Sequence, residues 1–319
     1  MPKKVSIVII TYNAKDDLKE CLESLEKQDY NEKEIIIVND ASTDGTLKFL
    51  EHYQSHLNEQ MVVITNKKNL GVAGARNVGI QHASGEIIAF TDSDCVTDQS
   101  WISELVKCYV NKEVVAVGGG ILNTRISNIW ELTEKGHDFV ATKEGYVSYI
   151  QGCNMSFDSN VLKKFMFNEE IKYGYEEKLL CDYLIRDRYS IYYRPQAVVY
   201  HKHRSNLPAL LKQKYLRGVS SIWYRKKQNK LFMFKRHIIF FISLFLIPFS
   251  IISILFSYLS FLLFLTFCLS LLRDEIIFKA KSIKEIMVTF PFLIFIEVFH
   301  FWGSCIGMFK FRFFLKSPS

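Results

Sequence analysis

Up to Gly118 the chain alternates between two kinds of segment, and this alternation constrains its fold more than any other feature. Short runs of strand length are continuously apolar, and between them the apolar residues recur at the spacing of an amphipathic helix. The expected strands are Val5–Ile10, Glu34–Val38, Met61–Thr65, Glu86–Phe90 and Val114–Gly118, and the expected helices are Asp16–Lys27, Thr46–His56, Val72–His82 and Gln99–Val110. The pattern predicts an α/β fold with a mostly parallel sheet and helices on both faces.

Beyond Asn123 the alternation is less regular. We expect strands at Tyr146–Phe157 and Ser190–Tyr200, with a helix at Glu176–Arg188 between them. Together with the first segments they form a predicted α/β domain over residues 1–205. In a sheet of this type, a ligand lies beyond the carboxyl ends of the strands, so polar residues that directly follow a strand are the candidates for function.

The remaining chain indicates attachment to a membrane. Residues 206–236 contain apolar residues at helical spacing among lysines and arginines, which predicts a basic amphipathic helix in the membrane interface. The uncharged stretch from Ile238 to Leu272 would be about 50 Å long as a single helix, against a hydrocarbon core of about 30 Å. We therefore expect a hairpin over 238–272, with a turn near Phe249–Tyr258, whose basic flanks lie on one side of the membrane. The third apolar segment, 286–309, is expected to be re-entrant or interfacial.

Charge and cysteine content favour a cytosolic α/β domain beside the cell membrane. The 40 lysines and arginines exceed the 33 acidic residues, and many adjoin the apolar stretches, as expected for a surface that faces anionic lipid rather than nucleic acid. The seven cysteines show no CxxC spacing, which fits a reduced compartment and neither a disulfide framework nor a zinc site. The apolar run after Lys4 is too short for the core of a secretory signal.

Polar residues follow three of the early expected strands. Thr11, Tyr12 and Asn13 follow the first, Asn39–Thr46 follow the second, and Asp92–Asp94 follow the fourth. Two carboxylates separated by one residue suit a divalent cation. The chain has neither a P-loop nor a GxGxxG motif after its first strand. Because both common phosphate cradles are absent, Mg²⁺ or Mn²⁺ is the expected partner of a diphosphate.

Several ordered blocks of the chain resemble the inverting glycosyltransferases of family 2, which have the GT-A fold. The matching blocks are Val5–Asn13, Glu34–Thr46, Gly71–Asn77, Asp92–Asp94, Gly152–Phe157, Glu176–Glu177 and Pro195–His203. They cover roughly the first two hundred residues, and their order makes the resemblance specific. It implies metal-assisted single displacement, in which a sugar moves from a nucleotide-diphospho-sugar, expected to carry uridine, to a lipid-linked or glycan acceptor in polysaccharide biosynthesis.

The resemblance also implies a role for individual residues. The nucleotide-sugar would be bound by Thr11, Tyr12, Asn13, Asp40, Arg76, Asp92, Ser93, Gly152 and Asn154. The Mg²⁺ or Mn²⁺ ion would be held by Asp94, with Asp92 and His201 completing its site. Glu177 would be the general base that takes the proton of the acceptor hydroxyl, with Glu176 as the alternative base.

The acidic pair departs from the family pattern, because Glu177 stands where the family usually has aspartate. Leu179 and Tyr183 also replace polar residues. A lipid phosphate acceptor is already anionic and needs no strong base, so a polyprenyl-phosphate sugar transferase of the same fold is an alternative. A membrane scaffold that binds nucleotide-sugar in a degenerate site is the non-enzymatic alternative. A nucleotidyltransferase would need a glycine-rich basic loop after the first strand, which this chain lacks.

Each candidate group also has a purely structural explanation. Asp40 suits a turn or a helix cap. The Asp92–Asp94 segment suits a solvated loop, the Glu176–Glu177 pair suits the positive start of a helix, and His201 suits an edge strand. The two kinds of explanation are therefore distinguished by whether these side chains meet in space.

Overall fold

The computed structural model describes residues 3–55, 61–111, 113–123, 126–135, 143–228, 238–239, 242–243, 245–246, 254–273 and 283–310. The chain divides into two compact units. Unit 1 comprises Met1–Thr124 and Asp138–Lys202, and unit 2 comprises Arg125–His137 and His203–Ser319. Unit 1 ends close to the predicted boundary at residue 205. The short excursion into unit 2 between Arg125 and His137 was not predicted.

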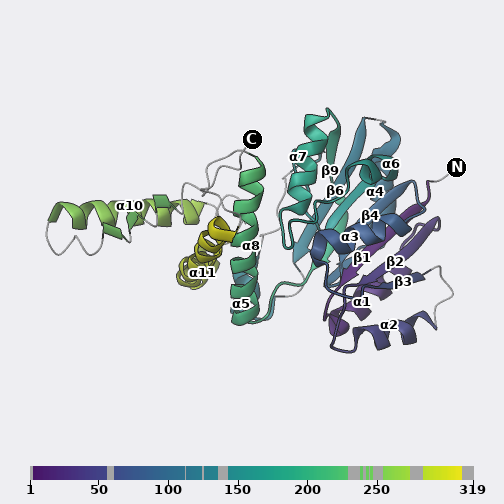
Figure 1. Cartoon of the computed structure of the whole chain (residues 1–319), viewed down its shortest axis with the longest axis horizontal. Coiled ribbons are helices and arrows are strands. Elements are labelled where there is room, and N and C mark those ends of the chain that lie inside the picture. The colour runs from purple at the N-terminus through teal and green to yellow at the C-terminus, as the bar shows by residue number, and fades with distance from the viewer. Residues whose placement is uncertain are drawn as a thin grey trace. The chain divides into compact units, whose positions relative to one another are not determined.

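Unit 1 is built on one sheet with the strand order β3-β2-β1-β4-β8-β6-β9-β5, and β7 pairs with β9 (Figure 1). The strands are β1 (Val5–Thr11), β2 (Lys33–Asn39), β3 (Met61–Thr65), β4 (Ile87–Asp92), β5 (Cys95–Thr97), β6 (Val114–Asn123), β7 (Gly145–Tyr146), β8 (Asn154–Asp158) and β9 (Ser190–His201). The strands β3, β2, β1 and β4 are parallel, as predicted. The other half is mixed, because β8 runs antiparallel to both β4 and β6.

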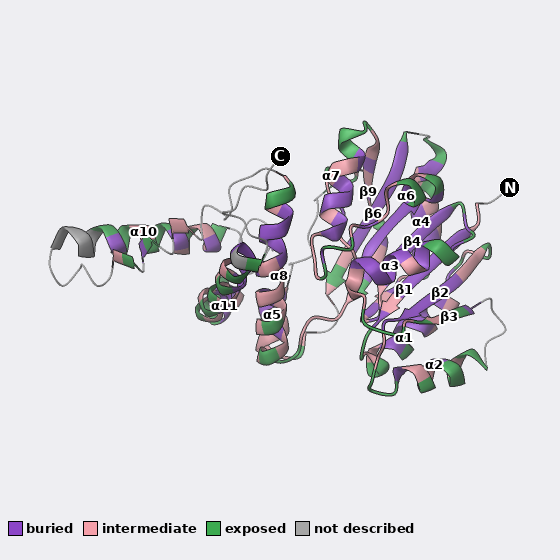
Figure 2. Ribbon diagram, in the orientation of Figure 1, coloured by how far each residue is buried: buried purple, intermediate pink, exposed green. Residues whose placement is uncertain are grey.

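Helices cover both faces of this sheet, which confirms the predicted layering. Those of unit 1 are α1 (Lys15–Glu26), α2 (Thr46–Gln54), α3 (Gly71–His82), α4 (Trp101–Lys107), α6 (Ser159–Phe165) and α7 (Glu176–Arg186). On β1, Ile7 and Ile9 belong to a buried cluster with Leu22 of α1. Val8 faces the other way, where a Cβ on Gly79 of α3 would lie 2.3 Å from its Cγ1. Strand alternation therefore gives β1 two buried faces, visible as the buried strands of Figure 2.

The structure differs from the predictions in two places. The expected strand Tyr146–Phe157 is interrupted: its first residue belongs to β7 and its last four belong to β8, and residues 147–153 between them form a loop. The three-residue strand β5 was not expected, because it is too short to show a period and exists only through pairing with β9. Both corrections lie next to the candidate site.

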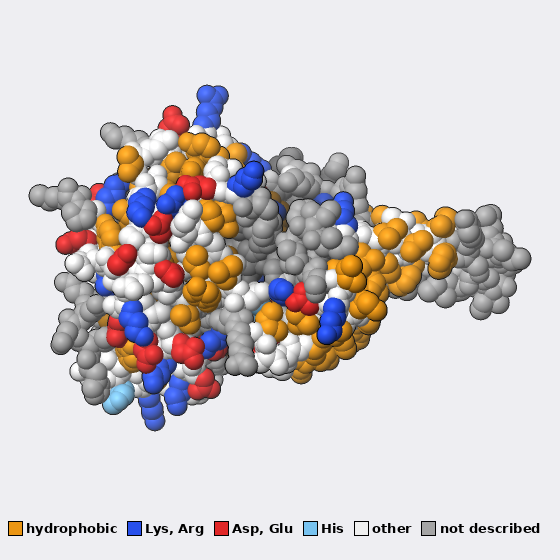
Figure 3. All heavy atoms as spheres, turned by 180° about the vertical axis from the view of Figure 1, so that it is seen from behind, with side chains coloured by type: hydrophobic (Ala, Val, Ile, Leu, Met, Phe, Trp, Pro, Cys, Tyr) orange, Lys and Arg blue, Asp and Glu red, His pale blue; other side chains and the backbone are white. Residues whose placement is uncertain are grey.

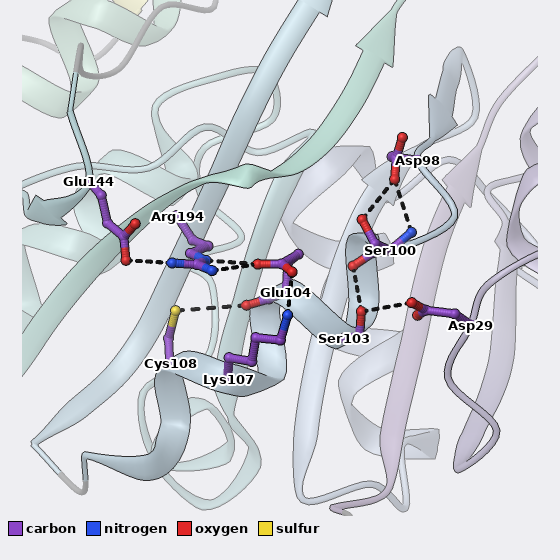
Figure 4. A network of polar contacts seen from close by, with 9 residues as sticks. All are labelled: Asp29, Asp98, Ser100, Ser103, Glu104, Lys107, Cys108, Glu144 and Arg194. Carbon is purple, nitrogen blue, oxygen red and sulfur yellow. Dashed lines mark hydrogen bonds and ion pairs between the residues drawn. The ribbon is translucent and has the colours of Figure 1, made fainter.

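Arg194 ties β9 to the neighbouring elements of unit 1. Its guanidinium donates to Glu104 Oε2 of α4 at 2.7 and 2.9 Å and to Glu144 Oε1 at 2.7 Å (Figure 4). Glu104 also pairs with Lys107 on its own helix. A bidentate arginine–carboxylate contact has defined geometry, so it fixes α4 and residue 144 against the sheet.

Unit 2 contains α5 (Ile129–Glu134), α8 (Leu207–Lys227), α10 (Ile254–Arg273) and α11 (Ile283–Lys310). Helices α8 and α11 pack unusually closely. A Cβ on Gly218 would lie 2.1 Å from His300 O, and one on Gly303 would lie 2.0 Å from Tyr215 O. Glycine at these positions allows the two backbones to touch. The predicted interfacial helix is thus one partner of a helix pair.

Charged contacts fix α5 within unit 2. Glu134 forms a buried ion pair with Lys214 of α8 at 2.9 Å, and Lys135 contacts Glu285 of α11 at 2.6 Å. The ring of Trp130 packs edge-on against Phe292, with centroids 5.2 Å apart. The six-residue helix is therefore held mainly by its partners rather than by its own length.

Helices α10 and α11 expose many apolar side chains (Figure 3). Within the described ranges, one helical stretch, Ile283–Met308, is long and apolar enough to cross a membrane by length and composition. It overlaps the segment 286–309, which was expected to be re-entrant or interfacial. The expected hairpin over 238–272 lies partly outside the described residues. Within its predicted turn, residues 254–258 are helical.

Candidate active site

The Asp92–Asp94 segment and His201 meet at one edge of the sheet. Asp92 ends β4, Asp94 lies in the turn to β5, and His201 ends β9. Because β5 pairs antiparallel with β9, Cys95 lies directly opposite His201. This pairing brings His201 Nε2 to 3.6 Å from Asp94 Oδ1. Residues more than a hundred positions apart therefore form one cluster, as the sequence predicted.

The donor atoms of this cluster fit a divalent cation. Ligand atoms of Asp94, Cys95 and His201 all lie within 4.8 Å of one another. A carboxylate oxygen and an imidazole nitrogen suit Mn²⁺, and the carboxylate also suits Mg²⁺. Burial raises the pKa of the Cys95 thiol to about 12, so this sulfur stays protonated and is a poor ligand for a hard cation. Asp94 and His201 are thus the residues that could hold the ion, with Asp92 beside them.

Arg76 of α3 connects the Asp92 end of the site to the acidic pair. Its buried guanidinium contacts Glu176 Oε1 at 2.6 Å and Asp92 Oδ1 at 3.4 Å, and it donates to the carbonyl of Gly152 at 3.1 Å. The rings of Phe90 and Phe167 lie beneath it, with their centroids 5.9 and 5.5 Å from Arg76 Cζ. Arg76 was predicted to support the nucleotide. In the structure its charge is already shared by carboxylates of two elements.

The two glutamates at the start of α7 have different surroundings. Burial, and then the neighbouring Glu177, raise the pKa of the Glu176 carboxyl to about 8 against the opposing effect of Arg76. Glu177 instead accepts a hydrogen bond from the Tyr149 hydroxyl at 2.9 Å. Glu176 therefore lies between the Arg76 guanidinium and the Glu177 carboxyl, whereas Glu177 also has the neutral Tyr149 hydroxyl as a partner.

Asp40 and Asn13 hold loops at the rim. The carboxylate of Asp40 is 2% exposed and accepts hydrogen bonds from Asn66 Nδ2 and from the backbone of Leu70 and Gly71, at 2.8–3.1 Å. These contacts fix the loop in front of α3. Asn13 has a positive φ of 52°, and its side chain accepts from Thr43 N at 2.7 Å, which joins the loops after β1 and β2. Contact of either residue with a nucleotide remains a prediction.

The carboxyl ends of β1, β2 and β4 carry buried polar atoms that find no partner among the described residues. They are Thr11 Oγ1, Asn39 Nδ2 and Thr91 Oγ1. Such atoms are rare in folded proteins, and a bound ligand or water is the usual explanation. Tyr12 is 51% exposed next to this row, and Ser93 is nearly buried at 9%. Buried polar atoms without a partner among the described residues therefore lie at the edge of the sheet that was predicted for the nucleotide.

Gly152 and Asn154 were expected to form a wall for donor and acceptor. The absence of a side chain at Gly152 lets Arg76 reach its carbonyl, because a Cβ there would be 2.7 Å from Arg76 Nη2. Asn154 is fully buried, donates to Gly120 O and Ala197 O, and accepts from Trp101 Nε1, each at 2.8 Å. Its side chain therefore links β6, β9 and α4, and its contact with a sugar stays a prediction.

Sequence reasoning missed Tyr149 and the metal-side neighbours Cys95 and Lys202. Tyr149 lies in the loop that was predicted to be a strand, and it has no motif of its own. Cys95 directly follows Asp94, but a cysteine beside a carboxylate is a weak signal. Lys202 lies between His201 and His203, in the block that resembles the family. Its position beside a predicted metal ligand was the one sign in the sequence that it could belong to the site.

Comparison with known sequences identifies what this arrangement is similar to. The family model described as "Glycosyl transferase family 2" matches residues 6–168. An uncharacterized glycosyltransferase of Haemophilus influenzae is 30% identical over 190 residues, which cover 54% of this chain and 58% of that protein. The chain thus spans less than two thirds of that relative. A Methanococcus voltae protein named as a dolichyl N-acetyl-glucosaminyl phosphate glucuronosyltransferase is 27% identical over 311 residues, 92% of each chain.

Solved structures support the same fold. The mannosyltransferase PcManGT of Pyrobaculum calidifontis, solved with GDP-mannose and Mn²⁺, matches with a TM-score of 0.63 and 17% identity, covering 97% of this chain and 88% of that one. GalNAc-T7, solved with UDP, GalNAc and Mn²⁺, matches with a TM-score of 0.55 and 17% identity, covering 71% of this chain and 50% of that one. These similarities confirm the predicted GT-A fold.

Proposed function

Because the chain belongs to glycosyltransferase family 2 and is a sugar-transferring enzyme, we propose that it moves a sugar from a nucleotide-diphospho-sugar to a lipid-linked or glycan acceptor at a membrane, with inversion at the anomeric carbon. The observation that carries the proposal is the meeting of Asp94 and His201 at the carboxyl edge of the sheet, where Asp92 ends the neighbouring strand β4. The unpartnered polar atoms of Thr11 and Thr91 at the same edge support a ligand there.

Asp94 and His201 would hold Mg²⁺ or Mn²⁺, with Asp92 beside them. When bound, the cation supplies positive charge against the negative charge that develops on the departing diphosphate. The exposed ring of Tyr12 and the row of polar groups behind it would receive the nucleotide. Structural neighbours were solved with GDP-mannose or with UDP, so both nucleotides belong in a donor panel. We retain uridine as the expected nucleotide.

Glu177 is the better candidate for the general base. An acceptor hydroxyl must lose its proton as its oxygen attacks the anomeric carbon, and a carboxylate is suited to take that proton. Arg76 contacts Glu176 at 2.6 Å. Among the described residues, Glu177 forms no ion pair, and its partner is the Tyr149 hydroxyl. The Tyr149 hydroxyl would orient one oxygen of Glu177 and leave the other for the acceptor.

Membrane attachment and a lipid-linked acceptor are supported by the composition of unit 2. The stretch Ile283–Met308 meets the length and apolarity of a span, and its exposed residues include Met287, Phe295 and Trp302. The Methanococcus voltae relative, matched over nearly its whole length, is named for a dolichyl-phosphate-linked acceptor. We place the catalytic unit on the cytosolic side, in agreement with seven free cysteines.

A screen of nucleotide-sugar donors on the purified full chain, with and without EDTA, tests this function. We expect release of nucleoside diphosphate with one donor class, dependent on Mn²⁺ or Mg²⁺ and abolished by Asp94→Ala. Undiminished turnover in that variant would refute the metal site. Analysis of the product separates the acceptors, because a phosphodiester-linked sugar would favour the polyprenyl-phosphate sugar transferase and a glycosidic bond the main proposal.

A further inference from the structure

One face of helix α1 lies along the segments that carry the candidate metal ligands. The Lys202 ammonium contacts Glu20 Oε2 at 2.9 Å and Asp17 Oδ1 at 3.2 Å, both on α1. The same residue donates its backbone N–H to the carbonyl of Asp94 at 3.0 Å. Lys202 therefore joins α1, the turn that contains Asp94, and the strand end that contains His201.

Further along the same face, α1 contacts both ends of the metal-bearing turn. The Cys21 thiol donates to the carbonyl of Asp92 at 3.6 Å. The Ser24 hydroxyl accepts from Thr97 N at 3.0 Å and lies 3.1 Å from Thr97 Oγ1. Positions separated by three or four residues share one side of a helix, so Asp17, Cys21 and Ser24 form a single row.

This support matters because β5 is only three residues long and pairs with β9 alone. A short edge strand does not by itself fix the distance between Asp94 and His201. Lys202 is connected to both metal-ligand candidates. Its backbone N–H is hydrogen-bonded to the carbonyl of Asp94, and it directly follows His201 in the chain. An ammonium group does not ligate a cation, so its contribution acts through these neighbours.

We propose that Lys202, anchored on Asp17 and Glu20, is a positioning residue that holds Asp94 and His201 at the separation needed to bind a divalent cation. The inference rests on the proposed metal-dependent function. The side chains of Lys202, Asp17 and Glu20 are 28%, 42% and 59% exposed, and ion pairs that are this exposed contribute little to overall stability. Loss of Lys202 should therefore affect metal binding more than folding.

The test is a titration of the purified full chain with Mn²⁺ in the presence of excess uridine diphosphate. Electron paramagnetic resonance measures how much Mn²⁺ is bound. We expect Lys202→Met to weaken Mn²⁺ binding about 2–5-fold, the most that ion pairs this exposed can transmit to the metal site, with an unchanged melting temperature. Lys202→Arg should restore most of the affinity. Asp17→Asn with Glu20→Gln should reproduce the loss without altering Lys202 itself.

Lys19→Met is the matched control, because Lys19 lies on the same helix and, among the described residues, forms its ion pair with the exposed Glu23 at 3.6 Å. Its Mn²⁺ affinity should equal that of the wild type. Wild-type affinity in Lys202→Met, or a melting temperature that falls in step with the affinity, would overturn the positioning role. If Asp94→Ala also binds Mn²⁺ normally, or the wild type binds none, the proposed metal site itself is wrong.

Discussion

The guanidinium of Arg76 is buried inside unit 1 and contacts two carboxylates, so Arg76→Met is expected to destabilise this unit strongly. The side chains of Arg76 and Glu176 are 3% and 4% exposed and lie 2.6 Å apart. Above the Glu176 pKa of about 8 both groups are charged, and breaking such a buried ion pair by removing one partner costs about 3–5 kcal/mol, since the other charge stays buried. The contact with Asp92 adds little, because that carboxylate is 39% exposed and 3.4 Å away.

For a unit of this size, each kcal/mol shifts the melting temperature by about 2–4 °C, so the predicted loss is about 6–20 °C. Trp101 is fully buried and is the one tryptophan of unit 1. In a chain in which Trp130, Trp223 and Trp302 are replaced by phenylalanine, tryptophan fluorescence therefore reports on unit 1. Unfolding of this chain by guanidinium chloride measures the free energy of unfolding of that unit. The same background chain without the Arg76 substitution is the reference.

A double-mutant cycle separates the ion pair from simple packing. Glu176→Gln removes the other charge, and the double variant leaves no isolated charge buried. Its loss of free energy of unfolding should be smaller than the sum of the single losses by about 1–3 kcal/mol. Strictly additive losses, or a loss below about 1 kcal/mol for Arg76→Met, would show that Arg76 and Glu176 do not form a buried charge pair.

Three further results are expected. Glu177→Gln should lower kcat by about 10²–10⁴-fold, the contribution of a general base, with little change in melting temperature; a normal kcat would exclude Glu177 as the base. The pKa of Glu176 is raised from 4.5 to about 8, so between these pH values the folded chain keeps a proton that the unfolded chain loses. The free energy of unfolding therefore falls as the pH rises from 4.5 to about 8. In Glu176→Gln the melting temperature should fall less steeply over this pH range than in the wild type. Lys214→Met should destabilise unit 2 by about 3–5 kcal/mol, because the Glu134 charge stays buried without its partner. A variant with Lys214→Glu and Glu134→Lys together should recover part of this loss. An unchanged melting temperature in Lys214→Met would contradict the buried pair.

Part of the candidate site can be predicted from the amino-acid sequence. Asp92, Asp94 and His201 were predicted from their place after strands and from the resemblance to family 2, and Asp94 and His201 lie 3.6 Å apart in the structure. Asn154 was selected on the same resemblance, but it is a buried link between strands. A motif identifies a position that matters and does not tell whether its side chain faces a ligand or the interior, because burial depends on neighbours that are remote in sequence.

The apolar C-terminal helices show the same division. Length and apolarity of Ile283–Met308 can be read directly from the residues. The close pairing of α8 with α11 cannot, since Gly218 and Gly303 are important only where two backbones touch. The spacing of basic and apolar residues therefore predicted α8 as a single interfacial helix and did not predict its partner α11.

The order of strands and helices and the polar residues after β1, β2 and β4 followed from the amino-acid sequence, because hydrophobic period is a local property of the chain. Tertiary structure alone decided that β5 pairs with β9, that Arg76 lies between Asp92 and Glu176, and that Lys202 reaches α1. These contacts join residues separated by up to 185 positions. They form only when the whole sheet is assembled, since the free energy that fixes them comes from burial and pairing across the entire unit.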